Sequence, residues 1–213
     1  MISSRSVVQD LQVTQLNDPE GVTWTEAQLI SALNQALRML QLLRPDATAK
    51  QAIVNVQPGA RQAIPSDGVR LIRVVCNVES DGAAGQVIRL VQREDMDSAS
   101  GSWLRATGLL VKEYMFDSRM PKQFFIYPRV REDKKIEIEY SARADTVTSA
   151  TFNSALPVDA MYSQPLQELM MYKLLSGDAT NGNNGAEHLQ IAMELLGVKD
   201  AQSERLSAAR KGS

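Results

Sequence analysis

Hydrophobic side chains recur every three or four positions in four parts of the chain, and this spacing predicts helices with one apolar face. The most regular series is made by Leu29, Leu33, Leu37, Leu40 and Leu43. Pro45 ends this series, because the residue before a proline disfavours helical backbone angles. We expect helices at residues 4–16, 24–43, 157–176 and 185–196.

Two helix ends carry specific signals. Thr23 and Glu26 have the spacing of a capping box, in which the threonine hydroxyl accepts the amide hydrogen of Glu26 and the glutamate reaches back. Trp24 lies within this box, and we expect it to pin the helix start to the core rather than to bind a ligand. Gly197 is expected to end the last helix in the left-handed conformation.

The stretch from residue 121 to 144 has the period of strands and predicts a β-hairpin. In its first arm Phe124 and Ile126 alternate with two other aromatic residues. The second arm alternates apolar and polar positions, through Ile136, Glu137, Ile138, Glu139, Tyr140 and Ser141. Pro128 has no amide hydrogen, which places it at a strand end or an edge.

Three further β-branched runs, at 52–56, 69–76 and 86–91, are separated by turn sequences rich in glycine and proline. Together with the hairpin they predict an antiparallel sheet of about five strands across residues 51–144. The fold class is therefore α+β, with this sheet packed against the N-terminal helices and a C-terminal αα-hairpin. We expect a single domain at 1–197, followed by a mobile C-terminal arm at 198–213.

Composition and charge exclude several classes of protein. Hydrophobic residues make up 44% of the 213-residue chain, which is enough for a core. The net charge of −2 gives no general attraction to nucleic acid or anionic membranes. No apolar run is long enough to span a membrane, and the first residues lack the pattern of a signal peptide. The single cysteine, Cys76, is expected to be a core residue.

Catalytic and metal-binding patterns are missing from the sequence. The only histidine, His188, is expected to be a surface or packing residue, and Cys76 has no cysteine partner for zinc. No phosphate-binding loop occurs. The acidic group Glu94, Asp95 and Asp97 is more typical of a solvated helical turn than of a cation site. We therefore predict no catalytic residue, cofactor or metal, and infer a structural or interaction protein rather than an enzyme.

Several short stretches support a more specific interpretation through their order along the chain. The first group is Trp24-Thr25-Glu26-Ala27-Gln28-Leu29, Asn34, Arg44-Pro45-Asp46-Ala47 and Ile64-Pro65. The second is Arg93-Glu94-Asp95-Met96-Asp97, Trp103 and Pro121-Lys122-Gln123-Phe124-Phe125-Ile126-Tyr127-Pro128. The third is Ile136-Glu137-Ile138-Glu139-Tyr140-Ser141, Leu156-Pro157, Tyr162 and Tyr172. In this order they resemble the head-to-tail adaptor (connector) proteins of short-tailed bacteriophages, which are related in role to the tail tubular A proteins.

The resemblance covers about residues 20–197 and departs from the family pattern at Ala142-Arg143-Ala144, where a proline is expected. It implies a structural virion protein at the head-tail junction, made in the host cytoplasm. Such a protein would form a homo-oligomeric ring of about 12 copies, bind the portal protein and a tail or nozzle protein, and surround a channel through which viral DNA passes without specific binding. No membrane partner is implied. The alternatives are a DNA-binding accessory protein and, third, a hydrolase.

Two hypotheses about sites follow from this interpretation. Acidic walls repel phosphates, so we expect some of five acidic residues to line the channel. The alternative is that these residues only increase the solubility of the protein. These are Glu94, Asp95, Asp97, Glu132 and Asp133. The second hypothesis makes the C-terminal arm a portal-binding segment, and its alternative is a disordered end without a role. The residues expected to make the contact are Arg205, Leu206, Arg210 and Lys211.

Overall fold

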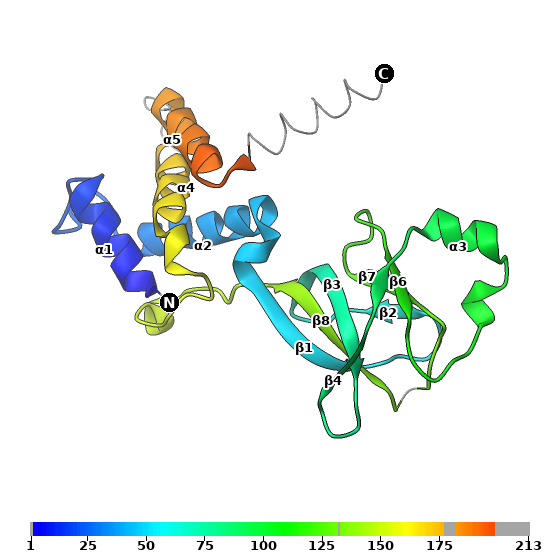
Figure 1. The fold of residues 1–213 in the computed structure, drawn as a ribbon. Coiled ribbons are helices and arrows are strands. Elements are labelled where there is room, and N and C mark those ends of the chain that lie inside the picture. Colours follow the sequence, from blue (N-terminus) through cyan, green and yellow to red (C-terminus); the bar gives the residue numbers. More distant parts are fainter. Residues whose placement is uncertain (1, 132, 177–181, 199–213) are drawn as a thin grey trace, which may run out of the picture. The chain divides into compact units, whose positions relative to one another are not determined.

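The computed structural model describes residues 2–131, 133–176 and 182–198. The chain divides into two compact units (Figure 1). The helical unit contains the residues up to Ala47 together with those from Ala144 onward, and the strand unit is Thr48–Arg143. The portal-binding candidates Arg205, Leu206, Arg210 and Lys211, and the acidic candidate Glu132, lie outside the described residues.

The helical unit is built around one nearly buried helix. Its elements are α1 (Ser4–Thr14), α2 (Glu26–Leu43), α4 (Ser163–Leu175), α5 (Gly182–Leu195) and the short 3-10 turns η1 (Pro45–Thr48), η3 (Ser149–Thr151) and η4 (Ala160–Tyr162). Helix α4 contacts α1, α2 and α5. It buries Leu166, Leu169, Met170, Met171 and Leu174, which cover most of its circumference and so make it the centre of the unit. The predicted pairing of two C-terminal helices is confirmed.

Helix α2 begins two residues later than the sequence predicted. Thr25 is the N-cap, its hydroxyl accepts from the Gln28 amide, and the Gln28 side chain accepts from the Thr25 amide at 2.9 Å. The predicted box at Thr23 and Glu26 is therefore wrong, and the observed box lies two residues later. The physical reason lies in Asp18, whose carboxylate accepts the amide hydrogen of Thr23 at 3.0 Å and holds it in the preceding loop.

Other helix ends also differ from the predicted ones. Helix α1 ends at Thr14, and α4 begins at Ser163 because the residues after Pro157 first form the separate turn η4, capped by the Asp159 side chain. Helix α5 begins at Gly182, inside the stretch predicted to be a loop. The predicted stop at Gly197 is confirmed, since this glycine has a φ of +67°.

The strand unit contains two four-stranded sheets instead of the single sheet predicted. The first sheet has the order β1-β8-β3-β4, with β1 (Ala49–Asn55), β8 (Lys135–Ala142), β3 (Gly68–Val78) and β4 (Ala84–Val87). The second has the order β2-β7-β6-β5, with β2 (Arg61–Ala63), β7 (Gln123–Tyr127), β6 (Glu113–Phe116) and β5 (Arg89–Leu90). All neighbouring strands are antiparallel except β5 and β6. The run predicted as one strand at 86–91 is split by the buried Ile88 between the two sheets.

The predicted hairpin at 121–144 is wrong, because its two arms belong to different sheets. Strand β7 forms a hairpin with β6, whereas β8 lies between β1 and β3. Both arms alternate buried with partly exposed residues as predicted, except at the end of β8, where Ser141 is buried instead of facing water. Strand β7 ends before Pro128, which cannot donate a ladder hydrogen bond. In β8, Ile136 and Ile138 are completely buried, and the neighbouring strands β1 and β3 are distant in sequence.

The two sheets share one hydrophobic core, to which β3, β6, β7 and β8 contribute most of the side chains. The core of the helical unit is formed by residues from the helices and their connecting segments, without any described strand residue. Each apolar face is thus buried within its own unit, and the packing of the helices on the sheet stays a prediction. Whether residues 1–197 behave as a single domain stays a prediction.

Candidate interaction surfaces

Within residues 2–131, 133–176 and 182–198, no three histidine, cysteine or acidic side chains come close enough to hold a metal ion. None of the described helices combines the length and the hydrophobicity that a membrane span requires. Cys76 is buried, and burial together with the nearby Glu137 carboxylate raises the pKa of its thiol.

Four of the acidic residues predicted to line a channel are described, and they fall in two places. Glu94, Asp95 and Asp97 are exposed on the short helix α3 (Arg93–Ala99), which confirms the predicted helical turn. Asp133 is exposed in the connection between β7 and β8, with its carboxylate 3.6 Å from the Arg131 guanidinium. Their orientation toward a channel stays a prediction.

Asp97 makes two structural contacts that could not be predicted from the neighbouring sequence. One carboxylate oxygen accepts the indole N–H of the buried Trp103 at 2.7 Å. The other lies 3.5 Å from the Arg93 guanidinium, one helical turn earlier. Asp97 thereby ties α3 to the following turn η2 (Trp103–Arg105). Among the predicted channel residues that the structure describes, Asp97 is the one whose carboxylate holds a neighbouring turn in place.

Phe125 of β7 is the side chain on which α3 and η2 are docked. The Arg93 and Arg61 guanidinium groups lie 5.1 Å and 5.6 Å from the centre of its ring, and the Trp103 ring meets it edge-on at 6.0 Å. Such cation–π and aromatic contacts stabilise partly exposed sites by about 0.5–1.5 kcal/mol each. Sequence reasoning missed this cluster, because Arg61, Arg93 and Phe125 come from three separate elements.

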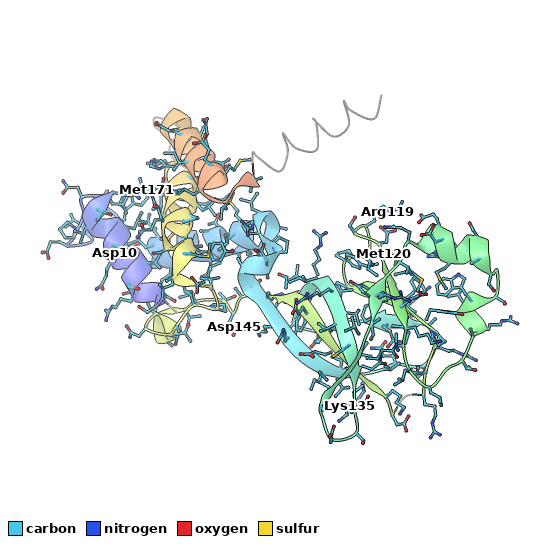
Figure 2. The ribbon with its side chains drawn as sticks, viewed as in Figure 1. Asp10, Arg119, Met120, Lys135, Asp145 and Met171 are labelled. Atoms are coloured by element: carbon cyan, nitrogen blue, oxygen red, sulfur yellow. The ribbon has the colours of Figure 1, made fainter. Side chains whose placement is uncertain are left out.

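A hollow of about 560 Å³ lies beside this cluster, between α3 and the β6–β7 connection. Arg119 and Met120 of that connection are labelled in Figure 2 and line the hollow with Glu94 and Asp97. Asp117 binds the Arg119 guanidinium at 2.7 Å, and this hydrogen bond lowers the pKa of the carboxyl group. The wall is therefore mixed in charge, and Asp133 lines a different hollow with Arg129 and Arg131.

One face of the first sheet carries an ordered polar network. Glu139 of β8 receives two hydrogen bonds from the Arg73 guanidinium, at 2.6 and 2.8 Å, and one from the Gln51 side chain at 2.8 Å. The Arg73 hydrogen bond, as the main cause, holds the pKa of Glu139 below its usual range. Because these residues are cross-strand neighbours, the network joins β1, β8 and β3 side chain to side chain.

The helical unit holds the single histidine in a structural contact. His188 Nδ1 of α5 lies 2.6 Å from the buried carboxylate of Glu168 on α4, and Gln15 donates to the other oxygen at 3.2 Å. This arrangement fits the packing role predicted for His188. Arg44 likewise binds Asp46 and donates to the carbonyl of Leu196 at 3.0 Å, which fixes the end of α5 near the end of α2.

Large apolar side chains are exposed on both units, each considered by itself. In the helical unit they are Val13, Val22, Leu42, Met161 and Leu195. In the strand unit they are Ile53, Val87, Leu90, Leu104, Leu109 and Met120. Single exposed apolar residues are ordinary, whereas large contiguous groups of them mark surfaces that contact other proteins.

Comparison with known families decides between the structural and enzymatic interpretations. The family model described as SU10 adaptor protein matches residues 5–212. The chain belongs to the SU10 adaptor protein family. This family consists of phage head-to-tail adaptors, so the role is structural rather than catalytic. No curated protein matches the chain significantly.

The SU10 adaptor match is wider than the resemblance seen in the sequence. The resemblance covered about residues 20–197, whereas the match begins in α1 and extends into the C-terminal arm. Membership implies contact with other virion proteins, which agrees with the ordered surface networks and exposed apolar residues described above. The matched stretch thus includes the residues predicted to bind portal.

Proposed function

We propose that about 12 copies of this chain form a ring between the portal and the tail of a phage particle, surrounding the channel through which DNA leaves. The observation that carries this proposal is the match to an adaptor family over residues 5–212. Two structural features support it. Each unit has its own core, so each can present a separate surface, and exposed apolar side chains lie on both.

The channel wall is assigned to acidic residues of the strand unit. Glu94 and Asp95 are exposed on α3 and do not carry the structural contacts that occupy Asp97. They therefore form the primary candidates, with Asp133 and Glu132 in the β7–β8 connection as the second group. Negative side chains at the wall keep the passing phosphates from adhering, which is what rapid passage of DNA requires.

Portal attachment is assigned to the C-terminal arm. Leu206 supplies an apolar anchor, and Arg205, Arg210 and Lys211 supply positive charges for acidic groups of the portal. Each contact is weak alone, but a ring presents many arms at once, and every arm after the first binds at high effective concentration. The tail or nozzle protein would then meet the opposite face of the ring.

Co-sedimentation with purified portal tests this assignment. The full chain is compared with a variant ending at residue 198 and with the triple variant Arg205→Ala, Arg210→Ala and Lys211→Ala. We expect portal binding to be lost by the truncated chain and weakened by the triple variant, with unchanged melting temperatures. A well-folded truncated chain that binds portal as well as the parent would contradict the role of the arm.

Retention on a DNA column separates the adaptor from a DNA-binding accessory protein. An adaptor with an acidic channel should pass the column at physiological salt. Strong retention that falls steeply with salt would instead favour DNA binding, because the release of counterions from neutralised phosphates makes such binding salt-dependent.

A further inference from the structure

The first sheet of the strand unit ends in two open edges. Its order, β1-β8-β3-β4, leaves one side of β1 and one side of β4 without a neighbouring strand in the part of the chain that the structure describes (Figure 1). Strand β1 has seven residues, of which five are exposed. An exposed edge of this length offers unpaired backbone groups to any other chain, and stable proteins usually cover such an edge.

The directions of the strands allow one edge to pair with the other. Successive strands of this sheet are all antiparallel, and their number is even. Strand β4 therefore runs opposite to β1, and a second copy placed beside the first would bring its β4 antiparallel to β1. The second sheet offers a shorter joint, because its edges β2 and β5 have three and two residues, against seven for β1 and four for β4.

The side chains on the two edges also match in register. Ile53 lies opposite Glu137, Glu137 opposite Cys76, and Cys76 opposite Val87. These residues form one row on one face of the sheet, since directly opposed residues point to the same side. Both ends of this row are apolar and exposed, with Ile53 54% and Val87 67% accessible. Continuing the row into a second copy places its Val87 next to Ile53.

Oppositely charged residues lie at the same end of the two edge strands, acidic beside β4 and basic beside β1. The turn after β3 carries Glu79 and Asp81, both exposed. Lys135 lies level with this turn, because it is opposite both Val78 on β3 and Asn55 on β1, and Figure 2 shows it at that end of the sheet. Lys134 is bound through its carbonyl to the amide of Val56, just beyond β1. Among the described residues, neither the acidic turn nor this lysine pair makes an ion pair.

We propose that β1 of one copy pairs antiparallel with β4 of the next, so that neighbouring subunits are joined by a continuous β-sheet. The Val87 and Ile53 side chains meet across this joint, and the Glu79–Asp81 turn lies beside Lys134 and Lys135. The contact is head-to-tail, using different surfaces on each copy, and contacts of this kind close into a ring when the rotation from one copy to the next divides a full turn evenly. This inference rests on the proposed ring and specifies how its subunits bind one another.

Cysteine cross-linking tests the joint directly. Ile53→Cys and Val87→Cys are combined in a Cys76→Ser background, because Cys76 lies opposite Val87 and would otherwise capture the new thiol within one subunit. The protein is oxidised mildly, alone and mixed with purified portal, and rings are counted in negative-stain images. A control pairs Ile53→Cys with Leu104→Cys, which is an exposed apolar site on η2.

The inference predicts a ladder of covalent multimers from the edge pair. It should exceed the control by about tenfold beyond the dimer, since neighbouring thiols in a ring meet at millimolar effective concentration. Rings without cross-links above the control would overturn the β1–β4 joint and leave the proposed ring intact. If neither sample forms rings, the proposed function fails and the joint fails with it.

A second variant serves if the Cys76→Ser background does not fold. Val87→Lys in the native chain changes an exposed residue, so the fold should be kept, but it places a charge where the next copy's Ile53 would pack. We expect the protein concentration needed for ring formation to rise at least about tenfold, and Leu104→Lys to leave it unchanged. Equal behaviour of the two lysine variants would also overturn the joint.

Discussion

Asn34 and Val147 are joined by two hydrogen bonds, although 113 residues separate them in the chain. The Asn34 side chain donates to the Val147 carbonyl and accepts from its amide, both at 2.8 Å. Both residues are buried, and Val147 belongs to the segment that follows the strand unit. The pair therefore fastens the returning chain to α2 and completes the helical unit.

Replacing Asn34 with alanine should destabilise the helical unit. A buried backbone group left without a partner costs roughly 1–3 kcal/mol, and this substitution exposes two such groups to an apolar environment. Urea unfolding of Asn34→Ala measures the loss. Arg38→Ala, an exposed change on the same helix, should stay within about 0.5 kcal/mol of the parent, and an equal stability of both variants would show that the hydrogen bonds contribute little.

Leu33 and Leu169 are central to the helical core, and neither is exposed at all. Truncation of either to alanine should cost roughly 2–5 kcal/mol, because it removes apolar contacts and leaves a cavity. Leu42→Ala is the matched control, since Leu42 is 77% exposed on the same helix as Leu33. Thermal melts that do not distinguish Leu33→Ala and Leu169→Ala from this control would contradict the assigned helix faces.

Trp103→Phe should loosen α3 without unfolding the strand unit. Phenylalanine keeps an aromatic ring against Phe125 but cannot donate to Asp97, and a hydrogen bond of this kind contributes on the order of 1 kcal/mol. We expect faster hydrogen exchange within residues 93–105 and little change in β8. The larger substitution Trp103→Ala should cost about 3–5 kcal/mol. Unchanged exchange in α3 for both variants would be evidence against the anchoring role of Trp103.

The lowered pKa of Asp18 should make the stability of the fold fall at acid pH. Its carboxylate accepts three backbone amides, and that of Trp24, the main cause, together with those of Val22 and Thr23 lowers its pKa. A group whose pKa is lower in the folded state stabilises the fold above its usual pKa, near 3.8, and loses this effect as the pH falls through the folded value. The melting temperature of Asp18→Asn should thus lie below that of the parent at pH 6–7.

The difference between Asp18→Asn and the parent should shrink toward pH 3. Asp10→Asn is the control, because Asp10 is exposed on α1 (Figure 2). A difference that stays constant between pH 7 and pH 3 would mean that Asp18 acts through packing and not through its charge.

Local sequence patterns correctly predicted the helices and strands that depend on neighbouring residues. They failed for helix starts and strand pairing, which depend on residues distant in the sequence. The leucine series predicted α2, but two overlapping capping boxes fit its start, and the choice depends on Asp18 holding the Thr23 amide. Alternation predicted β7 and β8 correctly as strands, whereas their assignment to different sheets depends on β1, β2, β3 and β6. A hairpin is the shortest connection, so the sequence alone favours it.

The candidate site shows the same limit. The acidic residues of α3 were recognisable from composition, but the engagement of Asp97 depends on Trp103, and the Phe125 cluster on three separate elements. No local signal identifies such contacts. The two exposed apolar residues proposed to meet in the subunit joint, Ile53 and Val87, likewise looked like ordinary strand residues until the strand order was known.

Negative-stain imaging of this protein mixed with purified portal shows whether it forms a ring on the portal. We expect class averages in which a ring of about 12 subunits, with an open centre, sits on one end of the portal. Portal particles that remain bare at saturating concentrations of well-folded protein, or that bind it as single scattered subunits, would contradict the proposed adaptor ring.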